Sequence, residues 1–263
     1  IFEKPSLRTR VSFEVAMTQL GGTATYLDQT AIGLGDREPA KDIARVLGRM
    51  CDAIMARTFS HEMVEQLSEH GGVPVINGLT DYSHPCQAMA DFVTIREYLG
   101  ALKGKTLVFV GDGNNVARSL AVGSAKLGMK FVLSSPPGFE LEETFFEKLI
   151  DAHPGADCAL IRAPGQAVKN ADVVYTDTWV SMGQEKEREK RMHIFQAYQV
   201  NEGLMALAPS HAIVLHCLPA YRGCEISGEI FEKQAGSIFD QAENRLHFQR
   251  TLLDVLLTHG GVE

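Results

Sequence analysis

The sequence has no Cys-x-x-Cys pair, no fixed-period repeat and no low-complexity tract. None of its apolar runs approaches the roughly 18 residues of a membrane-spanning helix. Its five cysteines are an odd set, which fits reduced thiols better than a disulfide framework. Positive charge is scarce, because 25 Lys and Arg stand against 33 Asp and Glu, for a net charge of −8. These absences argue against a disulfide scaffold, a membrane span and a general nucleic-acid surface.

What is present is the composition of a globular protein, with 45% hydrophobic and 22% charged residues among 263. That length can bury a large core in one or two α/β domains. Short β-rich runs alternate with longer amphipathic ones, which is typical of parallel sheets with crossover helices. The first residue is Ile, so we expect natural residues to precede it, and a removed targeting peptide stays open.

The alternation predicts two α/β domains with a boundary near 100–104. In the first we predict helices at 11–20, 40–50, 60–69 and 86–99, strands at 23–27, 53–57 and 73–76, and a Gly-rich loop at 31–36. In the second we predict strands at 106–110, 130–134, 158–162, 173–176 and 212–216, and helices at 115–127, 141–150, 165–170, 192–206 and 228–235. A last helix is predicted at 241–258. The domains are then 1–99, with 241–263 packing back on it, and 100–240.

Polar residues crowd the start of the first helix, at Ser6–Arg10. A helix presents unpaired N–H groups and the positive end of its dipole there, which together favour an anion. Arg8 can add a planar guanidinium that matches two phosphate oxygens. Taken alone, this stretch is explained better by an ordinary Ser N-cap and solvated arginines, so an anion site here needs support from other parts of the chain.

Two further groups come at or after strand ends, where open α/β sheets bind ligands. Arg57 closes an apolar strand, and a guanidinium there needs an anionic partner, which a neighbouring carboxylate would supply equally well. Pro85 favours the start of a helix. His84 and Gln87 would face the mouth of that helix, where both can donate hydrogen bonds to a carbonyl oxygen, although a histidine before a proline is usually incidental.

The segment Gly111–Asn115 imitates a dinucleotide-binding loop, but Val116 stands where the third glycine is required. A dinucleotide-dependent oxidoreductase or binding module therefore stays open as a rival. The ordinary alternative is a tight turn in which Asn115 caps the next helix. Its amide could equally hold a substrate carboxylate.

A last group comes after the strands 173–176 and 212–216. Asp177 and Ser181 come after the first of these and could bind an ammonium group. Cys217 closes the second, although a lone Cys in such a place is more often an apolar filler. We do not favour a thiolate nucleophile, because the sequence does not place a histidine against this thiol.

Four motifs, taken together, resemble the ornithine-specific signatures of the aspartate/ornithine carbamoyltransferase family. They are Phe2–Arg10, His84–Gln87, Asp177–Gly183 and His216–Pro219, in the order and spacing of the family. The resemblance runs from Ile1 to near the C-terminus. It implies a carbamoyl-phosphate domain and an ornithine domain, each doubly wound around a central parallel sheet, joined by interdomain helices. It also implies a homotrimer or a multiple of trimers. The cysteine usage favours the cytoplasm, and the charge and the lack of a long apolar run predict no nucleic-acid or membrane partner.

The resemblance also implies a reaction and its residues. Carbamoyl would pass from carbamoyl phosphate to the side-chain amine of L-ornithine, giving L-citrulline and phosphate in arginine biosynthesis, without a cofactor or a metal. Carbamoyl phosphate would be bound by Ser6, Leu7, Arg8, Thr9, Arg57, His84, Gln87, Cys217, Leu218 and Arg245. Ornithine would be bound by Asn115, Asp177, Ser181 and Met182. The catalytic residues would be Arg57, His84, Asp177 and Cys217.

Three departures from the family pattern accompany these expectations. Leu7 stands where many members have Thr, which removes a hydroxyl but keeps the backbone N–H. Gly33 falls where many members carry a glutamine that reaches the neighbouring subunit. About forty family residues, including a first helix, would precede Ile1. Putrescine and N-acetylornithine remain alternative acceptors, and a catalytically silent member is a further alternative.

Overall fold

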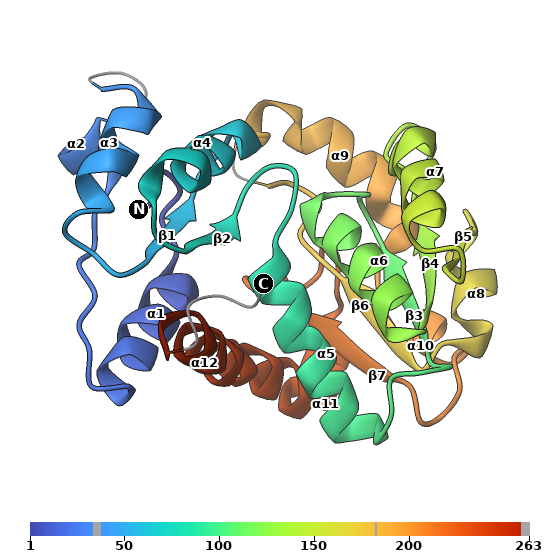
Figure 1. Cartoon of the computed structure of the whole chain (residues 1–263). Coiled ribbons are helices and arrows are strands. Elements are labelled where there is room, and N and C mark those ends of the chain that lie inside the picture. Colours follow the sequence, from blue (N-terminus) through green and yellow to red (C-terminus); the bar gives the residue numbers. More distant parts are fainter. Residues whose placement is uncertain (34–37, 182, 259–263) are drawn as a thin grey trace. The chain divides into compact units, whose positions relative to one another are not determined.

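The computed structural model describes residues 1–33, 38–181 and 183–258, and Figure 1 shows its ribbon coloured along the sequence. The chain forms two compact units, Ile1–Ala90 with Glu243–Glu263, and Asp91–Ala242. It passes between them within α5 (Pro85–Leu99) and within α12 (Ala235–Thr258). The predicted domain limits stay a prediction. No helix in the described ranges combines the length and apolarity that crossing a membrane requires.

The first unit packs helices against a parallel pair of strands. Its elements are α1 (Leu7–Gln19), α2 (Gln29–Ile32), α3 (Ala40–Leu47), β1 (Ile54–Arg57), α4 (His61–Gly71), β2 (Val75–Leu79) and the start of α5. Ala44 of α3, Ile54 of β1 and Leu67 of α4 share one buried cluster. Figure 1 shows α3 and α4 beside β1. Arg57 therefore ends a strand that is held by a packed core.

Two expectations for this unit are wrong. Helix α1 begins at Leu7 and not at residue 11, because Ser6 is its N-cap and accepts from the Thr9 N–H. The expected strand at 23–27 is not a strand. That segment is largely exposed and pairs only through isolated bonds, such as Phe2 N–H to the Leu27 carbonyl at 2.8 Å. Of the expected loop at 31–36, residues 34–36 lie outside the described residues.

The second unit contains a five-stranded parallel sheet. Its strands are β3 (Thr106–Val110), β4 (Lys130–Ser134), β5 (Asp157–Leu160), β6 (Val173–Thr176) and β7 (Ile213–His216), in the order β5-β4-β3-β6-β7. The order reverses between β3 and β6, so the carboxyl ends of these two neighbours form the switch point where open α/β sheets bind ligands. The predicted α/β fold with parallel sheets is confirmed.

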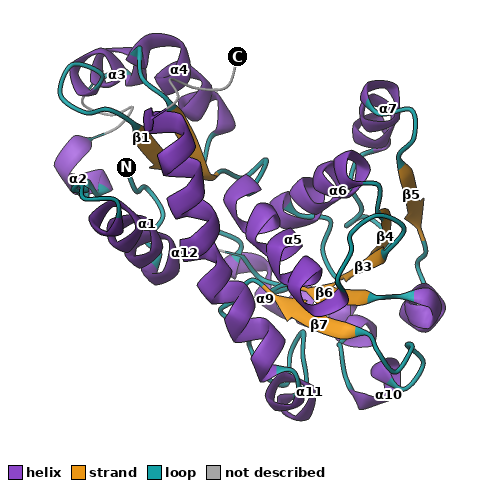
Figure 2. Cartoon of the chain, turned by 60° about the horizontal axis from the view of Figure 1, so that its bottom comes forward, coloured by secondary structure: helices purple, strands orange, loops and turns teal. Residues whose placement is uncertain are grey.

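Both faces of this sheet are covered. The helices are α6 (Asn115–Leu127), α7 (Glu143–Ala152), α8 (Pro164–Ala167), α9 (Arg188–Phe195), α10 (Glu202–Met205) and α11 (Gly228–Lys233), with short 3-10 turns at Val168–Asn170, Glu185–Glu187 and Gln196–Tyr198. Figure 2 shows α6 on one side of the strands and α10 and α11 on the other. Val108, Val174 and Val214 belong to the cluster that includes Phe195 and Phe231. Alternate strand residues therefore reach opposite faces.

The predicted bounds of β3, α6, β4 and β6 match the structure. The predicted helix 192–206 is wrong as a single element, because it is split into α9, a 3-10 turn and α10. Asn201 begins the last piece as an N-cap, with its side-chain oxygen 3.0 Å from the Leu204 nitrogen. A side chain that caps a new helix has to interrupt the old one.

Gly113 lies too close to neighbouring backbone atoms to accommodate a side chain. A Cβ there would lie 2.6 Å from the Leu141 nitrogen and 2.7 Å from the Glu140 carbonyl carbon, both of which are backbone atoms. We expect Gly113→Ala to lower the free energy of unfolding by about 1–3 kcal/mol through overpacking. Thermal unfolding would register a loss of roughly 2–4 °C per kcal/mol. Gly155→Ala, which meets nothing within 4 Å, is the control, and equal Tm values for the two variants would contradict the prediction.

Candidate active site

The N-terminus of α1 supplies four of the residues predicted to bind carbamoyl phosphate. Ser6 caps the helix, and its hydroxyl lies 3.1 Å from the buried Thr9 hydroxyl. The Leu7 side chain is 74% exposed, so only its backbone N–H is suited to bind a ligand. Arg8 lies in the same first turn, which contains no acidic residue. The positive helix end is therefore not neutralised by its own first turn.

Arg245 joins three segments that are far apart in the sequence. One of its terminal nitrogens donates to Gln87 Oε1 at 2.7 Å, and the other donates to Thr9 Oγ1 at 3.2 Å. Gln249 adds an acceptor: with its amide oriented to satisfy its neighbours, its oxygen lies 3.0 Å from Arg245 Nε. The structure thus brings together three predicted residues, from α1, α5 and α12. Gln249 was not anticipated from the sequence.

Positive charge surrounds His84 at the start of α5. His84 is buried, and its pKa is lowered well below the usual value, first by burial and then by the charges of Arg245, Arg57 and Lys4. The ring is therefore neutral near pH 7 and can donate one hydrogen bond. Arg57 is itself only 7% exposed at the end of β1. Lys4, which was not anticipated from the sequence, forms a short ion pair with Asp81.

Asp177, one of the predicted acceptor residues, follows the end of β6 in the second unit, and its carboxylate accepts three hydrogen bonds. Its Oδ2 accepts from Asn114 Nδ2 at 2.8 Å, and its Oδ1 accepts from the Thr178 N–H at 2.8 Å. The Cys217 thiol donates to the same Oδ1 across 3.0 Å. Because burial and the adjacent Asp177 raise the Cys217 pKa well above its usual value, the sulfur is a neutral thiol. This favours the interpretation that it is not a thiolate nucleophile.

Asn114, and not Asn115, is the N-cap of α6. Its side-chain oxygen accepts from the Val116 and Ala117 N–H groups, at 3.0 and 3.1 Å. The alternative in which Asn115 caps the helix is therefore wrong, and Asn115 is the first helical residue. The same Asn114 amide holds Asp177, so one side chain begins α6 and orients the acid beyond β6.

The loop after β3 does not offer the donor that a dinucleotide would require. The Gly113 N–H donates to the Phe139 carbonyl at 2.7 Å, and Asp112 pairs with the buried Arg191 at 2.7 Å. Arg191 also donates to the Trp179 carbonyl at 3.2 Å. This guanidinium, which the sequence analysis missed, fixes the loop to the segment that follows Asp177. The dinucleotide alternative loses its structural support.

Ser181 and Leu218 lie in the same unit as Asp177. The Ser181 N–H donates to Gln184 Oε1 at 3.1 Å, and Met182 lies outside the described residues. Leu218 has a φ of 57°, in the left-handed region, and its N–H donates to His216 Nδ1 at 2.9 Å. Cys217 and Leu218 were predicted with the carbamoyl-phosphate set, and the structure places the Cys217 thiol against Asp177, one of the predicted acceptor residues.

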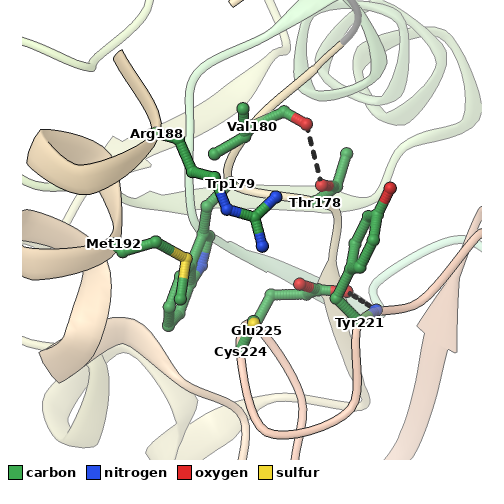
Figure 3. A pocket seen from close by; sticks show the side chains of 8 residues that line it. All are labelled: Thr178, Trp179, Val180, Arg188, Met192, Tyr221, Cys224 and Glu225. Carbon is green, nitrogen blue, oxygen red and sulfur yellow. Dashed lines mark hydrogen bonds between the residues drawn. The ribbon is translucent and has the colours of Figure 1, made fainter. Parts of the chain in front are cut away.

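The buried His216 ring stabilises the turn at Cys217 and Leu218. Its Nε2 lies 3.0 Å from Glu225 Oε1, and both side chains are fully buried. Asp177, His216 and Cys217 bring potential metal ligands within 4.8 Å of one another, but both His216 ring nitrogens are used by Glu225 and Leu218. Figure 3 shows the neighbouring pocket, into which Arg188 and Glu225 point from opposite sides.

These features define a class of protein: a two-substrate α/β enzyme, with a cationic half-site suited to a phosphate compound in one unit and an acidic half-site at the sheet switch point of the other. The known carbamoyl-P binding domain of aspartate/ornithine carbamoyltransferases matches residues 1–97. Their Asp/Orn binding domain matches residues 103–256. The chain belongs to the aspartate/ornithine carbamoyltransferase family.

Individual relatives agree with this assignment. An ornithine carbamoyltransferase of Pyrococcus abyssi is 49% identical over 265 residues, which cover 100% of this chain and 83% of the relative. One of Archaeoglobus fulgidus is 50% identical over 257 residues, covering 98% and 83%. The solved structure of ornithine carbamoyltransferase from Pyrococcus furiosus superposes with a TM-score of 0.92 at 48% identity, covering 100% of this chain and 84% of that one.

The raised pKa of Cys217 predicts slow alkylation. Cys51 is exposed and free, so iodoacetamide at pH 8 is expected to modify Cys51 long before Cys217. Asp177→Asn removes a negative charge that raises the Cys217 pKa. It should therefore lower that pKa and accelerate alkylation of Cys217, because each unit by which the pKa falls increases the thiolate fraction about tenfold. Peptide mass mapping over time measures both rates.

The control variant is Asp157→Asn. Asp157 helps to raise the pKa of Cys158 to about 11, so this change should accelerate alkylation of Cys158 and leave Cys217 alone. If Cys217 reacts as fast as Cys51 in the unaltered protein, its assignment as a neutral thiol is wrong.

Proposed function

We propose that the chain transfers the carbamoyl group of carbamoyl phosphate to the side-chain amine of L-ornithine, giving L-citrulline and phosphate as a step of arginine biosynthesis. The observation that carries the proposal is the cationic cluster of the first unit. Three separate segments supply Arg57, Arg245 and the buried His84, next to the N-terminus of α1. A protein of net charge −8 has little other reason to collect buried cations around a neutral imidazole.

Each residue of the cluster has a task in this reaction. Ser6, Arg8, Thr9 and the Leu7 N–H bind the phosphate, which suits the N-terminal end of a helix. Arg57 bridges the phosphate and the carbonyl oxygen, while His84 and Gln87 hold the carbamoyl group. Arg245 contacts the same ligand while it orients Gln87 and Thr9. Negative charge develops on the carbonyl oxygen during attack, and each well-placed donor stabilises it by roughly 3–4 kcal/mol.

The acceptor unit binds ornithine through groups of the opposite character. Asp177 attracts an ammonium, the Cys217 thiol lines the site of the reacting amine, and Asn115 and Ser181 hold the amino-acid end. Met182, the fourth predicted contact, belongs to the same proposal. A lysine-like amine has a pKa of about 10.4, so it has to lose a proton before it can attack. Desolvation favours its neutral form.

The bond changes are then simple. The neutral amine attacks the carbamoyl carbon, a C–N bond forms, and the C–O bond to phosphate breaks. The attacking nitrogen loses one of its two protons, which the departing phosphate accepts. Arg8 and Arg57 stabilise phosphate both as ligand and as leaving group. No step calls on a metal or a cofactor.

A homotrimer, or a multiple of trimers, in the cytoplasm completes the proposal. Leu7, Val11 and Val15 recur every four residues along α1 and are between 36% and 74% exposed, so they form an apolar stripe that a second subunit can cover. The five free cysteines suit a reducing compartment. No nucleic-acid or membrane partner is part of the proposal.

The first test is formation of citrulline from carbamoyl phosphate and ornithine. Arg8→Ala should lower kcat/KM by about 100- to 1,000-fold, because a charged transition-state donor is lost. Arg10→Ala is the matched control: Arg10 is exposed and pairs with Glu14 at 2.9 Å, and loss of such a pair should change the rate by less than about twofold. Equal effects of the two changes would contradict the role of Arg8.

The second test compares acceptors. Ornithine should be the fastest substrate in steady-state assays with ornithine, putrescine, N-acetylornithine and aspartate. Putrescine lacks the carboxylate that Asn115 would hold, and N-acetylornithine lacks the α-ammonium that Asp177 would meet. Aspartate brings an extra negative charge toward Asp177. A preference for putrescine would replace ornithine in the proposal and leave carbamoyl transfer in place.

A further inference from the structure

Gln241 is a fully buried amide in α12 that contacts the ends of two neighbouring strands. Its Oε1 accepts from the backbone N–H of His216, the last residue of β7, at 2.9 Å. Its Nε2 donates to the Tyr175 hydroxyl in β6 at 3.1 Å. A third bond runs from the same Nε2 to Asp91 Oδ1 in α5, at 2.7 Å. All four residues belong to the second unit.

These contacts involve residues that come just before two of the acceptor residues in the chain. His216 precedes Cys217, and Tyr175 lies two positions before Asp177. Strands β6 and β7 are paired in register up to Thr176 and His216, so Gln241 ties together the two backbones that carry the 3.0 Å contact from the Cys217 thiol to Asp177. Displacement of either strand end would change that distance.

Asp91 sets the orientation of the Gln241 amide. A carboxylate only accepts hydrogen bonds, so it requires the NH₂ group of Gln241 to face it. The amide oxygen is then left facing the His216 N–H. Asp91 is fully buried in α5. Burial raises the Tyr175 pKa well above its usual value, and the charges of Asp91, Cys217 and Asp177 raise it further. Tyr175 therefore keeps its proton and remains available as a hydrogen-bond partner.

We propose that Asp91 and Gln241 are positioning residues of the acceptor half-site, which set the separation of the Cys217 thiol and Asp177 by fixing the ends of β7 and β6. This inference rests on the proposed function, since ornithine turnover is its readout. The residues do not touch the substrate. They act through the His216 backbone and the Tyr175 hydroxyl, and a displacement of about 1 Å at a reacting site is enough to slow a reaction 100-fold.

The test exchanges the hydrogen-bond acceptor at Asp91 and the donor at Gln241. Gln241→Glu sets two carboxylates against each other where a 2.7 Å hydrogen bond stood, and should reduce kcat/KM for ornithine about 100-fold. Asp91→Asn keeps an oxygen that Gln241 can use, and should cost about tenfold, as for one weakened hydrogen bond. The double variant D91N/Q241E restores a donor opposite an acceptor, with a carboxylate oxygen still facing the His216 N–H. It should recover to within about threefold of the unaltered protein.

Tyr98→Phe is the matched control, because the Tyr98 hydroxyl joins the same two helices through Asp240 at 2.6 Å without reaching a strand end. It should leave both kinetic constants within about twofold. The single variants should raise the KM for ornithine and lower kcat while the KM for carbamoyl phosphate stays unchanged. Circular dichroism and binding of carbamoyl phosphate by calorimetry check that each variant is folded.

The outcomes distinguish the positioning role from the proposed function. If the unaltered protein forms no citrulline, the proposed function fails. If it is active but folded Gln241→Glu retains its kcat/KM for ornithine, the positioning role is overturned. It is likewise overturned if the double variant loses as much activity as the two single variants multiplied together, or if both substrates' KM values rise alike, because those results describe a merely structural hydrogen bond.

Discussion

Positive charge removed from water is the constraint on which the first unit depends. Arg57 and Arg245 are both less than one-tenth exposed, and a guanidinium in that position is destabilising unless good acceptors face it. Gln87 and Thr9 satisfy N–H groups of Arg245 as neutral acceptors, so they orient the guanidinium and leave its charge in place. Burial lowers the pKa of His84 well below its usual value, and the charges of Arg245 and Arg57 lower it further. An anion that enters such a site gains electrostatic stabilisation that the folded chain has already prepared.

The second unit likewise holds a charged side chain through neutral partners, but here the charge is negative. Asp177 is held by an asparagine amide, a backbone N–H and a thiol, all of them neutral donors that fix the carboxylate without neutralising it. The hydrogen bonds converge because the carboxyl ends of β3, β6 and β7 lie side by side in the sheet order. In the proposed function, substrate selection follows from this contrast, with a phosphate bound in one unit and an ammonium in the other.

Much of this arrangement could be predicted from the sequence, and the exceptions share a cause. The strands β3, β4 and β6 and the helix α6 are long enough, and apolar enough on the buried side, for their pattern to give their bounds. The segment 23–27 has the same β-prone composition, but among the described residues it forms no strand ladder with a neighbour, and pairing is a tertiary property. Asn114, Arg191 and Gln241 were missed because each contributes through contacts to residues between 63 and 150 positions away, which leave no local spacing to detect. Asn115 was preferred to Asn114 as the cap because both positions carry an asparagine, and only the backbone conformation decides which of them is the N-cap.

The chemistry of the acceptor unit also limits where the amine proton can go. The Cys217 thiol keeps its own proton, because burial and Asp177 raise its pKa well above the usual value, so it cannot serve as a base near neutral pH. Both Asp177 oxygens already accept hydrogen bonds, and an incoming ammonium adds another donor to them. Protonating this carboxylate would weaken all of these interactions at once. When the C–O bond of the carbamoyl phosphate dianion breaks, phosphate leaves as the trianion, a strong base that becomes the dianion when it accepts the amine proton. The same departure that breaks the C–O bond thus supplies the base, which is why the proposed reaction needs cations and oriented donors from the protein more than it needs a basic side chain.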